Sequence, residues 1–442
     1  MFFLYSLILS IGFLVMLPLF ILRREKYASG FFERLGKYPE FSRDGGPVIW
    51  LQCVSVGETN AALPLFDILH KRFPGHRLII STTTRTGQRV ARDLFGKKAA
   101  AVFYFPFDWK FSVKRALSNY QPSLVLLLET EIWPRFIHET KNNGSLIAIV
   151  NGRLSERSYK GYSRFRSFVS RALLDLDLTA MQGEKDAERI ASLGMPADRI
   201  RVTGNIKFDQ QSKTDGHDIS REVGDRFGIS KERPLIIAAS THEPEERWIL
   251  DAYCSLAPGE TTNRPRLMIA PRHPERFDEV ATAIRDFRND PACEWKDYRL
   301  VRRSADARDD DGSADIILLD SIGELRDLYS LAEIVFVGGS LIPHGGQSVL
   351  EPAAAGKAIV TGPYTHNFAD SITMFKRSDA LVQLDKTPAG SIPDDLFLAF
   401  SDLLEDKNGR DELGQLAAGV MAANRGAASL TADIVEELLQ KQ

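Results

Sequence analysis

The sequence predicts two α/β domains, each built on a parallel β-sheet. At 442 residues the chain is too long for one compact core, and about 200 residues per domain is the expected size. Short apolar runs alternate with amphipathic, helix-like stretches throughout the chain, as βα units do. Polar residues or glycines directly follow several of these runs, and this is where open α/β sheets bind ligands.

The N-terminus predicts a membrane anchor. Met1–Leu22 contains no charged residue and is followed by Arg23-Arg24-Glu25-Lys26. An apolar helix of this length spans the roughly 30 Å hydrocarbon core of a bilayer. A cleaved signal peptide would carry its positive charges before the apolar run, and a buried core helix would need to be apolar all round. We therefore expect residues 1–22 to form a single transmembrane helix, with the rest of the chain on the cytoplasmic side.

The remaining chain divides at a polar, non-periodic stretch. Strands are expected in the first half at 48–52, 78–82, 101–105, 124–129, 146–150 and 178–182. In the second half they are expected at 235–239, 266–270, 315–319, 334–338 and 357–361. Residues 210–224 are the expected linker between domains at 23–209 and 225–442, and 303–313 is an expected surface loop. Two Rossmann-like domains facing a cleft, the arrangement called GT-B, follow from this pattern.

Composition excludes several classes of protein. The formal net charge of −3 gives no indication of nucleic-acid binding. Cys53, Cys254 and Cys293 are odd in number and far apart, so neither a disulfide framework nor a CxxC metal site is expected. Asp175 and Asp177 form a DxD pair of the kind found in metal-dependent glycosyltransferases, but they stand at the entry to a strand. No metal site is therefore expected.

Glu58 is a candidate general base. It follows Gly57 where the strand 48–52 gives way to a helix. Glycine allows a tight turn there, which would leave the next side chain at the ligand-binding edge of the sheet. A carboxylate in that place can accept a proton from a hydroxyl group. The alternative is structural, because an acid in the first helical turn complements the helix dipole.

Glu129 and Glu131 emerge from the apolar strand 124–129. Two residues apart on an extended chain, they would point to one side. Buried carboxylates are costly unless they are paired or used, so they can stabilise a developing cation or bind a sugar hydroxyl. An ion pair with Arg135 or Lys207 is the alternative. Lys207 also stands near the expected hinge, where a cation can reach a phosphate.

The segment 153–171 is basic and aromatic. Its single acid, Glu156, is outnumbered by Arg153, Arg157, Lys160, Arg164, Arg166 and Arg171. Tyr159, Tyr162, Phe165 and Phe168 are interleaved with them. Beside a membrane anchor, such a face suits an anionic lipid. The alternative is a solvated helix face with its aromatic residues in the core.

The second half offers groups that bind anions. Arg272 and His273 follow the strand 266–270, and a fixed arginine there binds phosphate or carboxylate. The glycine-rich stretches 338–340 and 345–351 open a helix whose backbone amides can hold a nucleotide phosphate, with Glu351 placed to accept hydrogen bonds from ribose. Taken singly, each piece also fits an ordinary turn and helix. The segment Ser240-Thr241-His242-Glu243 has capping-box spacing, which leaves His242 as a candidate ligand contact.

These motifs together resemble the Kdo (3-deoxy-D-manno-octulosonic acid) transferases of Gram-negative lipopolysaccharide assembly. The likeness covers essentially the whole chain. The motifs that carry it in the first half are Ser55-Val56-Gly57-Glu58-Thr59, Glu129-Thr130-Glu131-Ile132-Trp133-Pro134, Arg153-Leu154-Ser155 and Gly204-Asn205-Ile206-Lys207-Phe208-Asp209. In the second half they are Ser240-Thr241-His242-Glu243, Pro271-Arg272-His273-Pro274-Glu275-Arg276, Phe336-Val337-Gly338-Gly339-Ser340-Leu341 and Leu350-Glu351-Pro352-Ala353-Ala354.

The resemblance implies an inverting glycosyltransferase that moves Kdo from CMP-Kdo to a hydroxyl of a lipid A precursor, lipid IVA, at the inner membrane. It implies that Glu58 is the base and that Glu129, Glu131 and Lys207 stabilise the transition state. The residues it assigns to CMP are Pro271, Arg272, Ile322, Gly323, Glu324, Ser348, Val349, Leu350 and Glu351. No cofactor, no metal and no nucleic-acid partner are expected. Relatives often carry His-Asn where this chain has Gln347-Ser348, so altered nucleotide contacts with retained activity are expected.

Two other functions are weighed against this one. A transferase that uses another nucleotide sugar belongs to the same class. A membrane-tethered binding protein that kept the fold and lost catalysis belongs to a different class, and the intact Glu58 argues against it.

Overall fold

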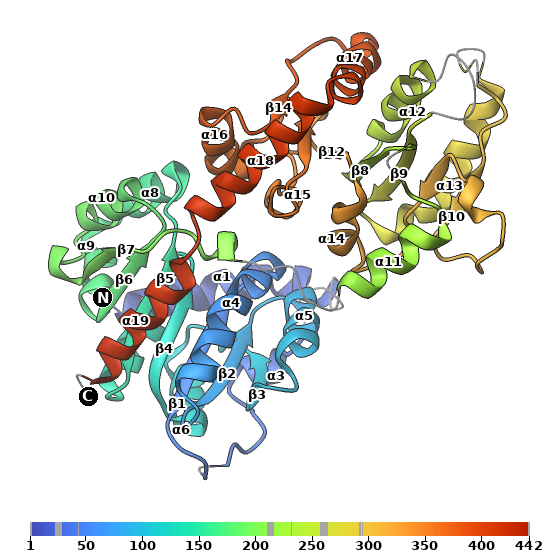
Figure 1. The fold of residues 1–442 in the computed structure, drawn as a ribbon. Coiled ribbons are helices and arrows are strands. Elements are labelled where there is room, and N and C mark those ends of the chain that lie inside the picture. The colour runs from blue at the N-terminus through green and yellow to red at the C-terminus, as the bar shows by residue number, and fades with distance from the viewer. Residues whose placement is uncertain are drawn as a thin grey trace. The chain divides into compact units, whose positions relative to one another are not determined.

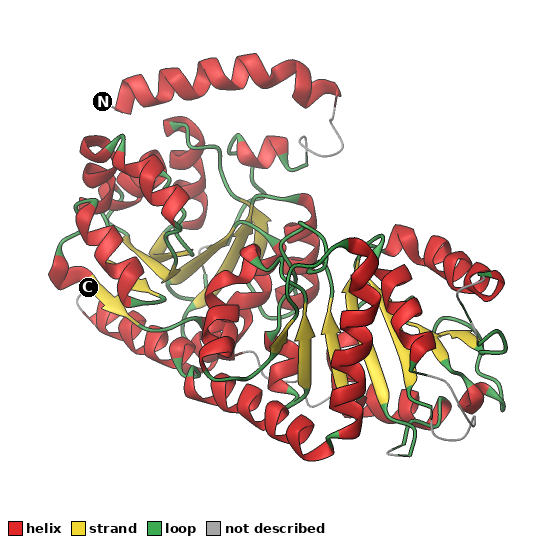
Figure 2. Cartoon of the chain, turned by 90° about the horizontal axis from the view of Figure 1, so that it is seen from above, coloured by secondary structure: helices red, strands yellow, loops and turns green. Residues whose placement is uncertain are grey.

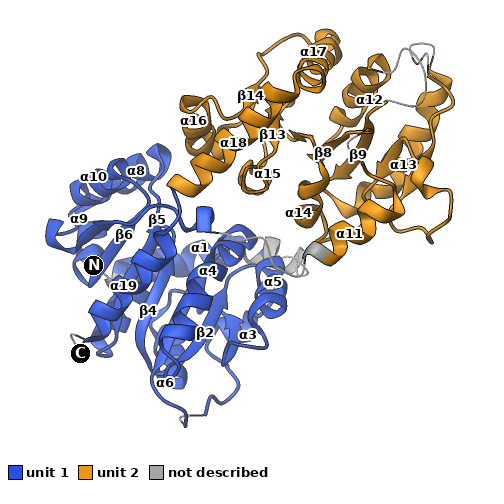
Figure 3. Cartoon of the chain, in the orientation of Figure 1, with its two compact units in different colours: residues 1–210, 424–442 blue, residues 211–423 orange. Residues whose placement is uncertain are grey.

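The computed structural model describes residues 2–22, 29–42, 44–209, 216–230, 232–256, 264–290, 293 and 295–440. The chain forms two compact units (Figure 3). Unit 1 comprises residues 1–210 and 424–442, and unit 2 comprises residues 211–423. Each unit contains a seven-stranded sheet in which the paired strands are parallel. Two Rossmann-like α/β units confirm the part of the predicted fold class that concerns the two domains.

Unit 1 has the strand order β3-β2-β1-β4-β5-β6-β7, so the order reverses between β1 and β4 (Figure 1). Its strands are β1 (Val48–Cys53), β2 (Arg77–Thr82), β3 (Ala101–Tyr104), β4 (Pro122–Leu128), β5 (Leu146–Gly152), β6 (Leu178–Met181) and β7 (Ile200–Val202). Its helices are α1 (Phe2–Leu22), α3 (Phe31–Arg34), α4 (Val56–Arg72), α5 (Arg85–Phe95), α6 (Lys110–Tyr120), α7 (Pro134–Asn142), α8 (Glu156–Ser163), α9 (Arg166–Leu174), α10 (Glu184–Ser192) and α19 (Ala427–Gln440), with 3₁₀ segments η1 (Ala197–Arg199) and η2 (Ile206–Asp209). The short strand β7 was not predicted.

The core of unit 1 lies on both faces of its sheet. All six residues of β1 are buried, with Ile49, Leu51 and Cys53 in one apolar cluster and Val48 and Trp50 in the other. Helices cover both faces (Figure 2). A strand covered on both sides buries every side chain, which explains why β1 and β4 read as continuous apolar runs rather than alternating ones.

Unit 2 has the strand order β10-β11-β9-β8-β12-β13-β14, which places β8 between β9 and β12. Its strands are β8 (Leu235–Thr241), β9 (Arg266–Pro271), β10 (Leu300–Arg302), β11 (Ile316–Leu318), β12 (Ile334–Val337), β13 (Ala358–Thr361) and β14 (Val382–Gln383). Its helices are α11 (Gly216–Arg226), α12 (Glu245–Ser255), α13 (Phe277–Asp286), α14 (Leu325–Leu328), α15 (Leu350–Ala354), α16 (Ala369–Arg377), α17 (Ile392–Glu405) and α18 (Lys407–Ala423). Its 3₁₀ segments are η3 (Pro274–Arg276), η4 (Phe287–Asn289), η5 (Asp311–Ser313), η6 (Tyr329–Leu331), η7 (His366–Phe368) and η8 (Ala389–Ser391).

The C-terminal helix α19 belongs to unit 1. The predicted second domain, 225–442, therefore ends too late, because unit 2 ends at residue 423. Both carboxylate oxygens of Asp209 accept hydrogen bonds at the start of α19, from Gly426 N at 2.6 Å and Ala428 N at 2.7 Å. The apolar face of α19, including Val435, packs into the same cluster as Leu65 of α4. Capping and burial together hold the helix to unit 1.

The predicted linker is also corrected. Residues 210–215 lie outside the described residues, while 216–224 belong to α11, whose Val223 is fully buried. The polar composition of this stretch is that of an amphipathic helix with one face on unit 2.

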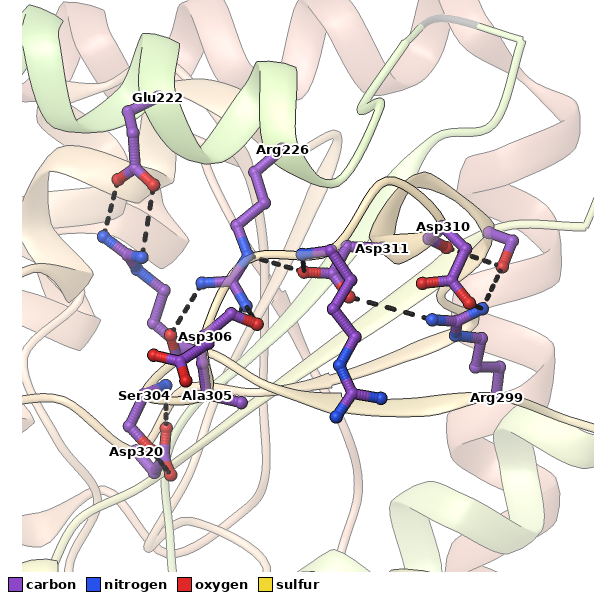
Figure 4. Close-up of polar contacts among 12 residues, drawn as sticks. Glu222, Arg226, Arg299, Ser304, Ala305, Asp306, Asp310, Asp311 and Asp320 are labelled. Atoms are coloured by element: carbon purple, nitrogen blue, oxygen red, sulfur yellow. Dashed lines mark hydrogen bonds and ion pairs between the residues drawn. The ribbon is translucent and has the colours of Figure 1, made fainter.

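The loop expected at 303–313 is tied to α11 by arginine (Figure 4). Arg226 of α11 donates from Nε to Asp311 at 2.8 Å and from its other nitrogens to the carbonyls of Arg303 and Ala305. Ser304 N donates to Asp320 at 2.8 Å. The side chains of Arg226 and Asp311 are both buried, so these contacts fix the loop to unit 2. Most of residues 303–313 are exposed, which confirms the predicted surface loop.

The N-terminal stretch forms helix α1, which contacts the rest of unit 1 through polar groups and aromatic rings. The Tyr5 hydroxyl donates to Asp108 at 2.7 Å, and the Trp109 indole donates to Ser10 at 3.1 Å. The basic residues expected to flank the helix, 23–26, lie outside the described residues. In the part of the chain that the structure describes, no helix combines the length and the apolar character needed to cross a membrane. The predicted transmembrane helix is therefore not supported.

Candidate functional site

In unit 1 the candidate site lies where the strand order reverses, at the carboxyl ends of β1 and β4. Neighbouring strands whose crossovers leave in opposite directions open a crevice at this edge, which is the usual ligand site of doubly wound sheets. Glu58 follows β1, and Glu129 and Glu131 follow β4. Burial raises the pKa of the Cys53 thiol at the end of β1, and Glu58 and Glu129 raise it further by their charge. The two glutamates are therefore close to one another.

Glu58 sits in the first turn of α4, where Ser55 is the N-cap. Val54 N donates to Glu58 Oε2 at 2.6 Å, and the Ser55 hydroxyl donates to Oε1 at 3.0 Å. The sequence placed a tight turn at Gly57, but Gly57 is already helical and Ser55 makes the turn. The structural role weighed for Glu58 is thus real, since its carboxylate closes the start of the helix.

The surroundings of Glu58 also change the pKa of its carboxyl group. The side chain is only 6% exposed, and burial raises its pKa from 4.5 to about 7. The backbone hydrogen bond from Val54 opposes that rise, whereas the nearby charges of Glu129 and Glu131 add to it. A buried carboxylate that titrates near neutral pH is suited to accept a proton from a hydroxyl group.

Glu129 is ion-paired, as one of the two alternatives predicted, and its partner is Lys207 rather than Arg135. Lys207 Nζ donates to Glu129 Oε1 at 2.8 Å, and Arg135 pairs instead with Glu139 at 3.2 Å. The strand ends at Leu128, and Glu129 has a φ of 55°, in the left-handed region. The prediction that both glutamates point to one side of an extended chain therefore fails. A non-glycine residue in this region is uncommon and carries backbone strain.

Glu131 is the second carboxylate with a pKa near neutrality. Burial raises its pKa from 4.5 to about 7, and the neighbouring Glu129 adds to the rise. Among the described residues, Glu131 forms no ion pair. Glu58, Glu129, Glu131 and Lys207 are thus brought together in unit 1, with three carboxylates and one cation.

Asn151, which sequence reasoning missed, positions Lys207. It is fully buried at the end of β5 and has a φ of 53°. Its side-chain oxygen accepts a hydrogen bond from Ile206 N at 3.0 Å, which fixes the start of η2 and hence the base of the Lys207 side chain. A single asparagine after an apolar strand carries no motif, and its partner is 55 residues away.

The basic, aromatic segment 153–171 forms α8 and α9, and its aromatic residues divide between core and surface. Tyr159 and Tyr162 pack against the apolar core of unit 1, as the structural alternative predicted. Phe165 is 70% exposed between the two helices. The only acid, Glu156, pairs with Lys160 at 2.7 Å within α8.

In unit 2 the equivalent edge is formed by β9, β8 and β12, and Glu245 organises it. This buried carboxylate accepts four backbone hydrogen bonds, from His242 at 3.0 Å, Gly339 at 2.7 Å, Ser340 at 3.0 Å and Leu341 at 2.9 Å. The loop after β12 is thereby joined to the start of α12. The predicted capping box is wrong, because α12 begins at Glu245 and its N-cap has no side-chain hydrogen bond.

Arg272 stands at the end of β9, as predicted. Its backbone N donates to the Thr241 carbonyl at 3.0 Å, while its side chain is exposed. Within the described residues, this guanidinium forms no ion pair. Pro271, by contrast, is the buried last residue of β9, so it shapes the edge rather than offering a polar group.

The segment Ile322-Gly323-Glu324 forms a projecting turn, with Ile322 74% exposed and Gly323 at a φ of 93°. The Glu324 carboxylate is fixed by hydrogen bonds within unit 2. Arg303 donates to both of its oxygens at 3.1 Å, and Ser321 donates to Oε2 at 2.5 Å. Arg303 also bonds Glu222 of α11. The carboxylate of Glu324 therefore fixes the turn. The groups that the turn exposes to a ligand are those of its backbone.

The stretch Ser348–Glu351 opens the short helix α15. The side chains of Val349 and Leu350 are buried, so these two residues offer only backbone groups to a ligand. Burial raises the pKa of Glu351, although Arg326 opposes the rise. Upstream, Gly346 N donates to the Gly339 carbonyl at 2.7 Å, which closes the glycine-rich loop upon itself.

The DxD pair has structural partners. Asp175 contacts His138 at 2.8 Å, and Asp177 accepts a hydrogen bond from Ile147 N at 2.9 Å. Over the described ranges, no group of three or more histidine, cysteine or acidic side chains is arranged to hold a metal ion.

Comparison with known proteins gives the family. The family model described as 3-deoxy-D-manno-octulosonic-acid transferase (kdotransferase) matches residues 29–210. The 3-deoxy-D-manno-octulosonic acid transferase of Haemophilus influenzae is 32% identical over 97% of this chain and 96% of that protein, and that of Bordetella pertussis is 30% identical over 98% and 99%. Among solved structures, a putative UDP-N-acetylglucosamine 2-epimerase from Listeria monocytogenes is similar in fold, with a TM-score of 0.58 and 14% identity over 90% of this chain and 98% of that one.

The matches to these two relatives cover 97% and 98% of this chain, so they span both units. The chain therefore belongs to the 3-deoxy-D-manno-octulosonic acid (Kdo) transferase family of glycosyltransferases.

Proposed function

We propose that this Kdo transferase moves Kdo from CMP-Kdo to a hydroxyl of a lipid A precursor, lipid IVA, with inversion at the anomeric carbon and Glu58 as the base. The observation that carries the proposal is the buried Glu58 carboxylate, whose pKa is raised to about 7 beside Glu129 and Glu131. Family membership supplies the reaction, and this carboxylate supplies a group that can drive it.

In the proposed reaction Glu58 takes the proton of the acceptor hydroxyl. The hydroxyl oxygen forms a bond to the anomeric carbon, the bond from that carbon to the phosphate oxygen breaks, and CMP leaves with the electron pair. Val54 N and the Ser55 hydroxyl fix the carboxylate, at 2.6 and 3.0 Å, so it needs no reorientation to accept the proton. Glu129 and Glu131 would stabilise positive charge that develops at the anomeric carbon, and Lys207 would stabilise negative charge on the departing group.

We assign CMP to the edge of unit 2. Arg272 would contact the phosphate, because its guanidinium is exposed and forms no ion pair within the described residues. The exposed turn Ile322–Glu324 and the backbone of Ser348–Leu350 would bind cytidine and ribose, with Glu351 accepting hydrogen bonds from ribose hydroxyls. No metal ion is required in this proposal, since CMP leaves with one phosphate group rather than a diphosphate.

We also propose that the enzyme works at the cytoplasmic face of the inner membrane, where a lipid acceptor resides. Supporting this, one side of α1 carries a row of exposed apolar side chains, among them Leu7, Ile11 and Leu14. Exposed apolar rows of this kind bind membrane surfaces. Cell fractionation tests the proposal: the wild-type protein should sediment with inner membranes, and Ile8→Lys with Ile11→Lys should move it to the supernatant.

Donor selectivity tests the proposed function. The purified protein is incubated with lipid IVA and either CMP-Kdo or a UDP-linked sugar, and released nucleotide is quantified. CMP release that depends on lipid IVA is expected, with no release of UDP. Release from the UDP-sugar alone would favour the transferase of other specificity. Binding of CMP-Kdo without turnover would favour a binding protein that has lost catalysis.

A further inference from the structure

Three histidine rings gather at the edge of unit 2 beside the proposed nucleotide site. His242 follows β8, His273 follows β9, and His344 lies in the loop after β12. The ring centres of His242 and His344 are 4.2 Å apart, and those of His242 and His273 are 5.4 Å apart. Because β9, β8 and β12 are neighbours in the sheet, their following loops bring the rings together. None of the three histidines has a role in the proposed function as stated above.

His242 is the buried centre of the cluster, and one of its nitrogens is unsatisfied. The residue is 8% exposed, and its Nδ1 lies 3.1 Å from the Ser240 carbonyl, so Nδ1 carries a proton and donates. Nε2 is buried and has no hydrogen-bond partner among the described residues. In the neutral ring Nε2 is an acceptor, and it becomes a donor only when a second proton is added. A buried polar atom left unpaired in a folded protein indicates a missing partner.

The charges around the cluster keep His242 neutral in the free protein. Burial, together with the charges of the adjacent His344 and His273, lowers its pKa from 6.5 to about 4. The Ser240 carbonyl and Glu246 act in the opposite direction, but Glu246 already pairs with Arg276 at 2.8 Å.

The other acids near the cluster supply no free negative charge that could balance a protonated histidine. Glu245 is committed to backbone amides, and Glu275, 3.7 Å from His273 Nδ1, is mostly exposed. Arg272 adds a positive charge next to His273. An anion that enters the cluster would supply the negative charge that protonated imidazoles need.

We propose that His242, His273 and His344 form a binding site for a phosphate monoester dianion that takes up a proton as the anion binds. The proposal rests on the proposed function and extends it. In CMP-Kdo the phosphate is a diester with one negative charge. When the bond from the sugar carbon to the phosphate oxygen breaks, the electron pair stays on the phosphate, which becomes a monoester with a second pKa near 6. A proton from solvent on His242 Nε2 then balances the added charge and converts that nitrogen into a donor.

The backbone beside the cluster packs closely against the rings and is held in place by Glu245. Gly339 lies between two of the rings, with a φ of 65°, and a Cβ added there would stand 3.4 Å from both His242 and His344. Its N–H is already held by Glu245, so the loop is fixed before the ligand arrives. The imidazoles are then the adjustable part of the site, and their protonation is what changes upon binding.

Calorimetry of CMP binding at pH 7.5 tests the proposal, because free CMP carries both phosphate charges there. Titrations in buffers of different ionisation enthalpy measure the protons exchanged. We expect net proton uptake in the wild type, and an affinity that falls between pH 7.5 and 8.5 by up to about tenfold for one linked proton. Cytidine should bind without proton uptake. Free Kdo provides the other anion, a carboxylate, and proton uptake with Kdo but not with CMP would overturn the assignment to phosphate.

Variants of the exposed His344 separate this role from a merely structural one. His344→Gln should reduce proton uptake to about half or less and flatten the pH dependence. His344→Arg, which keeps a fixed charge, should bind CMP with little proton uptake and a shallow pH dependence. His76→Gln in unit 1 is the matched control and should behave as the wild type. His242→Gln should abolish the uptake, and near-ultraviolet circular dichroism reports whether this buried variant retains the fold.

The outcomes distinguish the two proposals. CMP binding without proton uptake, or uptake that persists in His344→Gln and in folded His242→Gln, would overturn the histidine assignment and leave the proposed function standing. Absence of CMP binding in the wild type would instead contradict the proposed function.

Discussion

Replacing Glu58 with glutamine should weaken catalysis and strengthen the fold at the same time. The raised pKa of Glu58 means that the folded protein favours its protonated form. The protonated side chain contributes its full stabilisation of the folded protein below pH 4.5. This stabilisation is lost as the pH rises to about 7. Since one pKa unit corresponds to about 1.4 kcal/mol, the ionised carboxylate costs the folded protein up to about 3 kcal/mol above pH 7.

Glutamine removes that charge and keeps an oxygen that can accept the hydrogen bond from Val54. Above pH 7 we expect Glu58→Gln to be more stable than the wild type by about 1–3 kcal/mol, which is about 2–10 °C in Tm for a unit of this size. The difference should shrink steadily toward pH 5. Transfer should fall by about 10²–10⁴, because the proton acceptor is lost, with CMP affinity little changed.

The assay combines thermal unfolding from pH 5 to 8.5 with kcat/KM for transfer over the same range. Wild-type kcat/KM should rise with pH through about 7, as Glu58 ionises. Glu184 is the matched control: it also lies in a first helical turn of unit 1 but is exposed, so Glu184→Gln should change neither quantity. Near wild-type turnover in Glu58→Gln would refute the base assignment, and a pH-independent stability difference would refute the ionisation argument.

Four further predictions follow from the two sites. Arg272→Ala should weaken CMP binding by about 10- to 100-fold in calorimetry, since a hydrogen bond to a charged group contributes about 1.5–3 kcal/mol; unchanged affinity would place CMP elsewhere. Lys207→Met should change stability by less than about 1 kcal/mol, because its ion pair is partly exposed, yet lower turnover at least about tenfold; equal turnover would remove it from the transition state. Glu245→Ala should destabilise unit 2 by more than about 3 kcal/mol in denaturant unfolding, since four buried amides lose their acceptor, and a smaller loss would mean that water replaces it. Turnover should survive excess EDTA and the pair Asp175→Ala with Asp177→Ala; loss with recovery on adding Mg²⁺ would show that a metal is needed.

Much of this architecture could be read from the sequence because buried parallel strands leave continuous apolar runs. Glu129 and Arg272 were found because each directly follows such a run, and Glu58 because it lies at the helix start that comes after one. The short strands β7 and β14 were missed, because neither stands within a longer apolar run. The return of α19 to unit 1 was missed because its cap, Asp209, lies more than 200 residues before it.

The conformation of site residues was harder to predict than their identity. The strand β4 stops one residue before Glu129, whose positive φ redirects the chain, and nothing in the local sequence marks that change. Glu245 resembles an ordinary helix-start acid, and only the folded unit brings the amides of residues 339–341 to its carboxylate. Glu324 was predicted in the nucleotide site, but its carboxylate is bonded by Arg303, which the sequence does not reveal.

The central claim is that the protein transfers Kdo to a lipid acceptor with Glu58 as the base, and mass spectrometry of the lipid tests it most directly. Purified protein is incubated with CMP-Kdo and lipid IVA, and the lipid is weighed beside parallel reactions of Glu58→Gln and Glu184→Gln. The account predicts that the lipid gains whole Kdo residues, with one CMP released for each, in the wild type and Glu184→Gln but hardly in Glu58→Gln. An unchanged lipid mass with folded, CMP-binding wild-type protein, or an equal gain in Glu58→Gln, would contradict it.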